Sequence, residues 1–483
     1  MTRSALFAIC LLVGLCSAAL SQTTWHVDAS NPGCPGSGSP ADPFCKIQDA
    51  IQAASSGDTV LVAAGLYFEN IDYLGKDLVV RSLDGPQATI IDGSQAAPTV
   101  SFQSGEGTGA VIEGFRITRG YGLYAGGVLC SNGAAPVIRG NIISNNAAPS
   151  GGGVSCLSSA PTLINNTITL NSSSDGAGVY ALYASPTLIG NLIHRNSASF
   201  RGGGILMRGS TPVITQDILT YNSALYGAAL QSDNNSIVTL TNVTATLNDA
   251  MFGSVIDAAS GSLTIANSIV FKNTRYSIAS SALTNVTYSD IEGGYPGLGN
   301  LNIDPQLRNP NNGDTRLKCG SPMIDAGNNA PGIALPTFDQ ERRDRRLIGT
   351  IDIGADEYGL EWLLNGTGQV GQPASFLSSA APSQNGQLAE VYLSLNGTGS
   401  IPVPGGGGRV LELGFTGLLS LWLGLPPVIR QVSLNGCSGA STPSVTIPPG
   451  APVGLQVHYA GVSWNLGTGQ VISVAETRFF TTQ

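Results

Sequence analysis

Three charged side chains recur along the chain at an interval that would bring them together in a stacked structure. Arg208 and Asp233 lie 25 residues apart, and Asp257 follows one residue out of step. Carboxylates at such positions could bind Ca²⁺, but this ion takes about six to eight oxygen ligands, and the sequence holds no tight cluster of acids. An Arg–Asp ion pair on a solvated turn accounts for the same residues. The sequence leaves both interpretations open.

Four aromatic side chains recur at a similar interval, each just before a glycine turn. They are Tyr124, Phe200, Tyr226 and, one place later in its copy, Phe252. A side chain in front of a tight turn is expected to project outward, where a sugar ring could stack on it. Alternatively, each ring packs over its own turn or against its neighbour. If the rings are exposed, this column predicts contact with a polysaccharide.

Two cysteine pairs outside the repeat are candidates for disulfides. Cys34 and Cys45 are expected to close the loop between them in an oxidising compartment. By elimination, Cys319 and Cys437 would tie the repeat to the region that follows it. We expect no metal at these cysteines, because no close-spaced Cys/His pair occurs.

A further pair, Cys130 and Cys156, occupies equivalent positions in neighbouring copies of the repeat. Strands one coil apart are separated by about 4.8 Å, which is within the Cα–Cα span of a disulfide. The sequence therefore favours a bridge, with a stacked pair of buried thiols as the alternative.

The repeat that positions all these side chains has a period of about 25 residues. Its anchors are five Asn and one Asp: Asn141, Asn166, Asn191, Asp217, Asn242 and Asn267. A second series follows five residues after the first four anchors: Asn146, Asn171, Asn196 and Asn222. The apolar runs between these marks are too short for helices, so they are predicted to be strands.

A repeat of this length, built from short strands, predicts an all-β fold, a right-handed parallel β-helix of roughly ten coils with three strands in each. Asn tolerates the left-handed backbone conformation that a sharp turn requires. Identical Asn side chains stacked on successive coils can also bond as a ladder. Glycines are expected to supply the other turns with positive φ.

The two ends of this array carry their own signals. Residues 1–21 are typical of an export signal, which predicts a chain released to the cell surface or the extracellular medium. The β-helix is predicted over residues 22–358. Near its start, Ile47, Ala50, Ile51 and Ala54 fall at helical spacing. A short amphipathic helix there would cover the open end of the core.

Composition limits the partners. The formal net charge is −9, and only 11% of residues are charged. Nucleic acid is excluded as a partner, because it would require a basic face. No stretch after the leader is long and apolar enough to form a membrane anchor. We expect a monomer.

Motifs at both ends of the array resemble those of a known group. The first set is His26, Pro43-Phe44, Ile47-Gln48-Asp49-Ala50, Gly57-Asp58-Thr59 and Gly65-Leu66-Tyr67. The second set is Asp304-Pro305, Ser321-Pro322, Ile324-Asp325-Ala326-Gly327 and Asp352-Ile353-Gly354-Ala355-Asp356-Glu357-Tyr358. Together they resemble the pectin-lyase-like superfamily of secreted bacterial right-handed β-helix proteins. The closing motif, 352–358, is expected to seal the last coil with turn caps and with ion pairs to Arg342–Arg346.

The resemblance implies a fold more strongly than an activity, because the superfamily holds lyases, hydrolases, esterases, epimerases and adhesins. Its β-eliminating enzymes use carboxylates to hold Ca²⁺ beside the substrate and an Arg or Lys as base. By this resemblance Arg208 would be the base, Asp233 and Asp257 the calcium ligands, and Ca²⁺ the cofactor. The paired-aspartate, Gly-His-Gly and Arg-x-Lys motifs of the polygalacturonase branch do not occur.

The 25-residue period ends at Gly359. Residues 359–483 show short alternating segments separated by Gly, Pro and Ser, which predicts a small antiparallel β-sandwich as a separate domain. For the whole chain three functions stay open. It could bind an extracellular polysaccharide or a cell-surface component, act as a polysaccharide lyase or glycoside hydrolase, or serve as a structural spacer at the cell surface.

Overall fold

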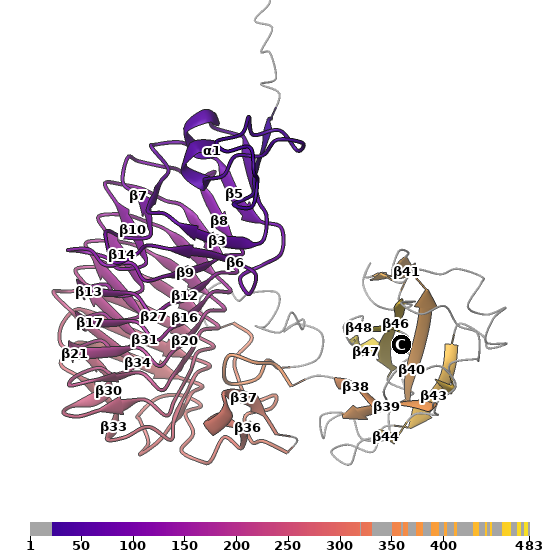
Figure 1. Ribbon diagram of the computed structural model, residues 1–483. Coiled ribbons are helices and arrows are strands. Elements are labelled where there is room, and N and C mark those ends of the chain that lie inside the picture. The colour runs from indigo at the N-terminus through magenta and orange to yellow at the C-terminus, as the bar shows by residue number, and fades with distance from the viewer. Residues whose placement is uncertain are drawn as a thin grey trace, which may run out of the picture.

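A computed structural model describes residues 22–318, 320–330 and 350–358, together with the backbone of the strands between residues 361 and 481. The predicted export signal, Cys319, Cys437 and the basic run at 342–346 lie outside the described residues. Residues 24–291 form a right-handed parallel β-helix whose strands stack in parallel along one rod (Figure 1). Along the part of the chain that is described, no helix is long and apolar enough to cross a membrane.

Two sheets run the length of the rod. Sheet 1 has 11 strands: β1 (Thr24–Val27), β2 (Thr59–Val62), β5 (Val79–Ser82), β8 (Val111–Glu113), β11 (Val137–Arg139), β15 (Thr162–Ile164), β19 (Thr187–Ile189), β23 (Val213–Thr215), β27 (Ile237–Thr241), β31 (Ser262–Ala266) and β34 (Leu283–Thr287). Sheet 2 has 10 strands: β3 (Gly65–Phe68), β6 (Thr89–Asp92), β9 (Arg116–Thr118), β12 (Ile142–Ser144), β16 (Thr167–Thr169), β20 (Leu192–His194), β24 (Ile218–Thr220), β28 (Thr244–Thr246), β32 (Ile269–Phe271) and β35 (Asp290–Ile291).

Two further sheets complete the coils. Sheet 3 has five strands: β13 (Ala147–Ser150), β17 (Ser172–Asp175), β21 (Ser197–Arg201), β25 (Ser223–Ala224) and β29 (Asp249–Ala250). Sheet 4 has nine strands: β4 (Ile71–Asp72), β7 (Val100–Phe102), β10 (Val128–Ser131), β14 (Val154–Leu157), β18 (Val179–Leu182), β22 (Ile205–Arg208), β26 (Leu230–Asp233), β30 (Ser254–Ala258) and β33 (Tyr276–Ser280). The prediction of three strands per coil was therefore wrong for the five central coils, because the segments expected to be turns pair as sheet 3.

The core is a stack of aliphatic layers between sheets 1, 2 and 4. In one coil these sheets contribute Ile138, Ile143 and Val154, and all three side chains are fully buried. Successive side chains of a strand point to opposite faces, so one apolar residue in each short strand is enough to fill its share of the core. This is why the repeat needs only two to four apolar residues between its polar marks.

Two ladders of buried amides hold the coils in register. In the first, the backbone N–H and the Nδ2 of Asn141 both donate to Oδ1 of Asn166, at 3.0 and 3.2 Å, and the same pattern continues to Asn191 and Asp217. The second ladder follows the same rule from Asn146 to Asn273. Stacking of the Asn residues as hydrogen-bonded ladders is thus confirmed.

The proposed reason for Asn at the first four anchors was wrong. The left-handed residue is the one before the anchor, for example Gly140 at φ 63° and Asn165 at φ 52°. The anchors themselves point inward and pair with the next coil.

The last two anchors are shifted by one position. The strand register aligns Asn242 with Gln216 rather than with Asp217, so Asn242 and Asn267 take the left-handed position, at φ 53° and 51°. There they bind a later segment: Asn242 Nδ2 donates to the carbonyls of Asp352 and Gly354, and Asn267 exchanges two hydrogen bonds with the backbone of Asn328.

A short helix, α1 (Ile47–Ala53), lies over the N-terminal end of the rod, as predicted (Figure 1). Ile47, Ala50, Ile51 and Ala54 are buried against the first coil. The Glu69 carboxylate accepts hydrogen bonds from the N–H groups at the start of the helix, and Lys76 Nζ donates to three carbonyls at its end. Opposite charges at the two helix ends suit the helix dipole.

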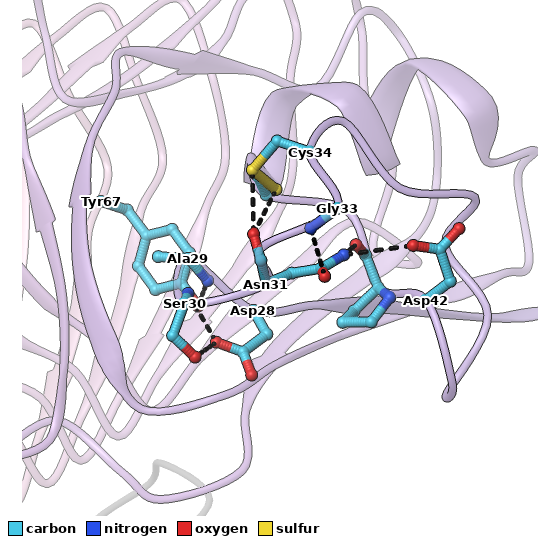
Figure 2. Close-up of a disulfide and its surroundings, with 10 residues drawn as sticks. Asp28, Ala29, Ser30, Asn31, Gly33, Cys34, Asp42 and Tyr67 are labelled. Atoms are coloured by element: carbon cyan, nitrogen blue, oxygen red, sulfur yellow. Dashed lines mark hydrogen bonds between the residues drawn. A yellow bond between two sulfur atoms is a disulfide. The ribbon is translucent and has the colours of Figure 1, made fainter.

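The disulfide between Cys34 and Cys45 is confirmed, with a Cα–Cα distance of 5.7 Å. It closes a loop in which the side chain of Asn31 accepts from the N–H of Gly33 at 3.0 Å and donates to Asp42 and Pro43 (Figure 2).

Cys130 and Cys156 are direct partners on adjacent strands, as their spacing predicted, but their thiols are free and buried. The predicted bridge is absent. Side chains on in-register parallel strands run side by side, so their Cβ atoms stay near the strand spacing of about 4.8 Å rather than the ~3.8 Å typical of disulfides.

The segment after the last coil folds back along the outer face of sheet 2. It contains β36 (Leu307–Asn309), η1 (Pro310–Asn312) and β37 (Asp314–Leu317), beside the C-terminal part of the rod (Figure 1). The closing motif packs Ile353 and Tyr358 against Ile269, and Asp352 accepts hydrogen bonds from the N–H groups of Asp325 and Tyr358. The predicted turn caps are confirmed, but the motif packs on the side of the rod rather than across its end.

The strands beyond residue 360 pair in antiparallel sheets, as predicted for this region. They are β38 (Glu361–Asn365), β39 (Pro373–Ser379), β40 (Leu388–Leu395), β41 (Ser400–Pro402), β42 (Val410–Glu412), β43 (Val428–Ser433), β44 (Ala440–Ser441), β45 (Val445–Thr446), β46 (Gln456–Trp464), β47 (Val471–Val474) and β48 (Arg478–Thr481). The domain boundary at 358/359 remains a prediction.

Asp217, the last member of the first ladder, should make the stability of the rod depend on pH. Its carboxyl is fully buried, Oδ2 has no hydrogen-bond partner, and burial raises its pKa from 3.8 to about 8, although hydrogen bonds from Asn191 oppose the rise. Between these two values only the unfolded chain releases the proton, so the free energy of unfolding should fall as pH rises. We expect Asp217→Asn to stabilise the protein on the order of 5 kcal/mol at pH 8 and very little at pH 4.

Denaturant unfolding of both proteins across this pH range measures the difference. Asp290, whose pKa burial raises to about 7, contributes a slope of the same sign to both proteins and cancels in the comparison. An Asn variant as pH-dependent as the parent would contradict the assignment.

Candidate functional site

The candidate site lies where each coil turns from sheet 3 into sheet 4. The turn residues Gly176, Gly202 and Gly227 have φ of 60–63° and sit over the following strand, where any Cβ would collide with the side chain four residues on. Only glycine fits this turn, so the residue before it is held at the edge of the outer face of sheet 4.

The residues that immediately precede these glycines form a column on successive coils. Its members differ from those of the predicted aromatic column. The strand register aligns Ser150, Asp175, Arg201 and Tyr226. Phe200 is not in the column, because the register of β21 shifts between Ser173 and Asp175, leaving one additional residue in that strand. Such a bulge re-aims the neighbouring side chains. It places Arg201 in the column and Phe200 beside it.

Three aromatic rings lie together beside this bulge. The Phe200 and Tyr226 ring centroids are 5.9 Å apart in an edge-to-face arrangement, and those of Tyr226 and Phe252 are 6.2 Å apart. Phe200 is 42% exposed and Phe252 is 51% exposed, while Tyr226 between them is half-buried. The rings therefore pack against one another, and the outer two still face solvent. We call these three residues the aromatic platform.

Tyr124 does not belong to the platform. It is 58% exposed, but the coils that carry Ser150 and Asp175 separate it from Phe200. Of the four predicted ring residues, the fold thus brings three together and leaves one apart.

Beside the platform, four charged side chains form a continuous network. Arg201 makes a two-pronged contact with Asp175, at 3.0 and 3.1 Å, and its Nη1 lies 3.0 Å from Oδ2 of Asp233. The other oxygen of Asp233 accepts from Nε of Arg208 at 3.0 Å. The Arg201 guanidinium also lies 4.8 Å from the Phe200 ring centroid, within range of a cation–π interaction.

This network does not suit the catalytic roles that the resemblance implied. Burial by itself would lower the pKa of Arg208, but the hydrogen bond and the charge of Asp233 raise it overall, so Arg208 holds its proton firmly. Both oxygens of Asp233 are engaged by guanidinium groups, which compete with a calcium ion. In the described ranges no three His, Cys, Asp or Glu side chains are grouped to hold a metal. The donor set does not fit Ca²⁺.

Asp257 lies elsewhere than predicted. It pairs in register with Gln231, not with Asp233, because β30 follows β26 with an offset of 26 residues rather than 25. Burial raises the pKa of its half-buried carboxyl. No residue in the described part of the chain donates a hydrogen bond to it or forms an ion pair with it.

The floor of the site is the outer face of sheet 4. Tyr180, Leu206, Gln231 and Asp257 follow one another in register there, and the first three are at most 6% exposed. Burial raises the pKa of the Tyr180 hydroxyl, although the charge of Arg208 opposes the rise. Oε1 of Gln231 is buried and has no partner among the described residues.

Sequence reasoning missed Arg201, Asp175 and Tyr180. The signal for the first was present, because the interval between Asn191 and Asp217 is 26 residues while those before it are 25. That coil therefore contains one additional residue. Counting from the anchors could not show at which point of the coil this residue is inserted.

Removing Arg201 should destabilise the fold more than removing an exposed arginine. Arg201, Asp175 and Asp233 are only 15–19% exposed at their side chains, so Arg201→Ala leaves Asp175 partly desolvated without a counterion and leaves Asp233 with Arg208 alone. We expect a loss of about 2 kcal/mol in the free energy of unfolding. Arg201→Lys should recover only part of it, because an ammonium cannot make the two-pronged contact.

Arg139→Ala is the control. Arg139 forms a single exposed pair with Glu113, whose loss should cost less than about 1 kcal/mol. Equal losses for Arg201→Ala and Arg139→Ala in chemical denaturation would show that the network does not stabilise the turn.

Comparison with known proteins agrees with this architecture. Residues 108–290 match a family described as the right handed beta helix region. No curated protein matches the chain. The match covers every residue of the aromatic platform and of the ion network, so the site lies on coils that are similar to those of right-handed β-helix proteins.

Proposed function

We propose that this protein is an extracellular β-helix protein that binds polysaccharide through the aromatic platform. The observation that carries the proposal is the arrangement of Phe200, Tyr226 and Phe252: three rings on successive coils, in mutual contact, with the outer two 42% and 51% exposed. If each ring served only to pack over its own turn, it would be expected to be buried there, and the rings would not form an exposed surface across three coils.

The neighbouring network supports the same function. Sugars present apolar C–H faces and polar hydroxyls, and the platform offers rings beside fixed guanidinium and carboxylate groups. Ion pairs already fix these side chains in place. Little side-chain conformational entropy would therefore be lost when a ligand binds. The disulfide between Cys34 and Cys45 supports an oxidising compartment outside the cytosol.

Retention on insoluble polysaccharides tests the proposal. The full chain is incubated with a panel of glycans, and the fraction that sediments with each is measured. We expect Phe252→Ala and Tyr226→Ala to weaken binding roughly tenfold, by loss of ring contact area. Phe68→Ala is the matched control, because Phe68 is 64% exposed on sheet 2, near the N-terminal end of the rod.

Reducing ends and unsaturated products are read in the same incubations. Product formation that disappears in Arg208→Ala would replace binding with the lyase alternative. An equal loss of retention in Phe68→Ala and Phe252→Ala would show that the platform is not the binding surface, and no retention on any glycan would favour a structural spacer.

A further inference from the structure

The charges around the platform cancel one another. Asp175 and Asp233 are neutralised by Arg201 and Arg208 through contacts of 3.0–3.1 Å. These four groups already satisfy one another, so a ligand carboxylate that approached Arg201 or Arg208 would have to displace an existing ion pair. The network offers fixed hydrogen-bonding groups but no excess positive charge.

Asp257 adds a negative charge close to the rings. A methyl group added at Gly253 would lie 3.1 Å from Cδ1 of Tyr226 and 3.8 Å from Oδ2 of Asp257, so the ring and the carboxylate flank the same glycine. Within the described ranges this carboxylate has neither an ion pair nor a hydrogen-bond donor. It is available to accept hydrogen bonds from ligand hydroxyls, and it would repel a ligand anion.

One further cation lies at the end of the column. The register of β30 with β33 places Arg275 next to the position of Gly253, one coil beyond Phe252. Its side chain is exposed. With Arg275 included, three acidic and three basic side chains surround the platform, and their sum is zero.

We propose that the platform binds an uncharged glycan and discriminates against uronate-containing ones. This inference rests on the proposed function and specifies its ligand. Sugar faces would stack on Phe252 and Tyr226, and the hydroxyls would donate to the half-buried carboxylate of Asp257. The balanced charges disfavour an anion for an electrostatic reason: each uronate carboxylate would bring a negative charge to a site whose charges already sum to zero and whose carboxylate Asp257 lies beside the rings.

Affinity electrophoresis of the full chain tests this. Neutral glycans (β-glucan, mannan, xyloglucan) and acidic ones (polygalacturonate, alginate) are compared at low and high salt. We expect retardation by at least one neutral glycan, with an affinity that does not change with salt, and no retardation by the acidic glycans. Asp257→Asn should weaken binding of the neutral glycan roughly tenfold, because a charge-assisted hydrogen bond becomes a neutral one, and Phe68→Ala should leave it unchanged.

Three results would contradict the inference, each at a different point. Retardation by acidic glycans alone, falling steeply with salt and lost in Arg275→Ala, would leave the platform as a glycan site but reverse its ligand class. Absence of retardation by every glycan would remove the proposed function and this inference with it. An Asp257→Asn variant that binds the neutral glycan as well as the parent does would exclude Asp257 from the site.

Discussion

The buried amide ladders are the interaction on which the rest of the structure depends. A parallel β-helix has no tight hairpins to fix its register, so each coil must find its place on the previous one through contacts at the turns. Each ladder Asn uses its side-chain oxygen to receive the coil before it and its side-chain nitrogen to donate to a carbonyl and to the next Asn. A slip of one residue would bury these amides without partners, which is costly. The ladders thus fix both register and spacing.

Fixed register is what allows a functional surface to form on outward-facing positions. Side chains at one position of successive coils lie in a straight column, so a row of aromatic or charged residues needs only the correct interval in sequence. Departures from the interval are equally informative. The bulge in β21 shifts Arg201 into the column, where it joins the ion network, and places Phe200 beside the column, in contact with Tyr226.

Asn242 and Asn267 show how one residue type takes two roles on the same scaffold. In the ladder position Asn faces its equivalents on neighbouring coils. One position earlier, in the left-handed conformation, it faces outward and binds the segment that returns along sheet 2. The change of role coincides with the end of the first ladder at Asp217. On the next coil Val243 is aligned with Asp217, so no side-chain amide is present there to extend the ladder. Where the first amide ladder ends, the hydrogen bonds of Asn242 and Asn267 begin, and they attach the returning segment with the closing motif to the side of the rod.

The sequence by itself determined the repeat, the parallel β-helix, the N-terminal helix and the Cys34–Cys45 loop. These follow from local periodicity, from short apolar runs and from nearby residues, all of which are visible along one chain. It also placed Arg208 beside Asp233, because their interval equals the period. Only the tertiary structure decided the rest: the fourth sheet strand in the central coils, the free thiols of Cys130 and Cys156, and the grouping of Arg201, Asp175 and the three rings. The physical reason is that coil-to-coil distances are a few ångströms, so the insertion of a single residue changes which side chains meet, and counting along the sequence does not reveal where a coil accommodates it.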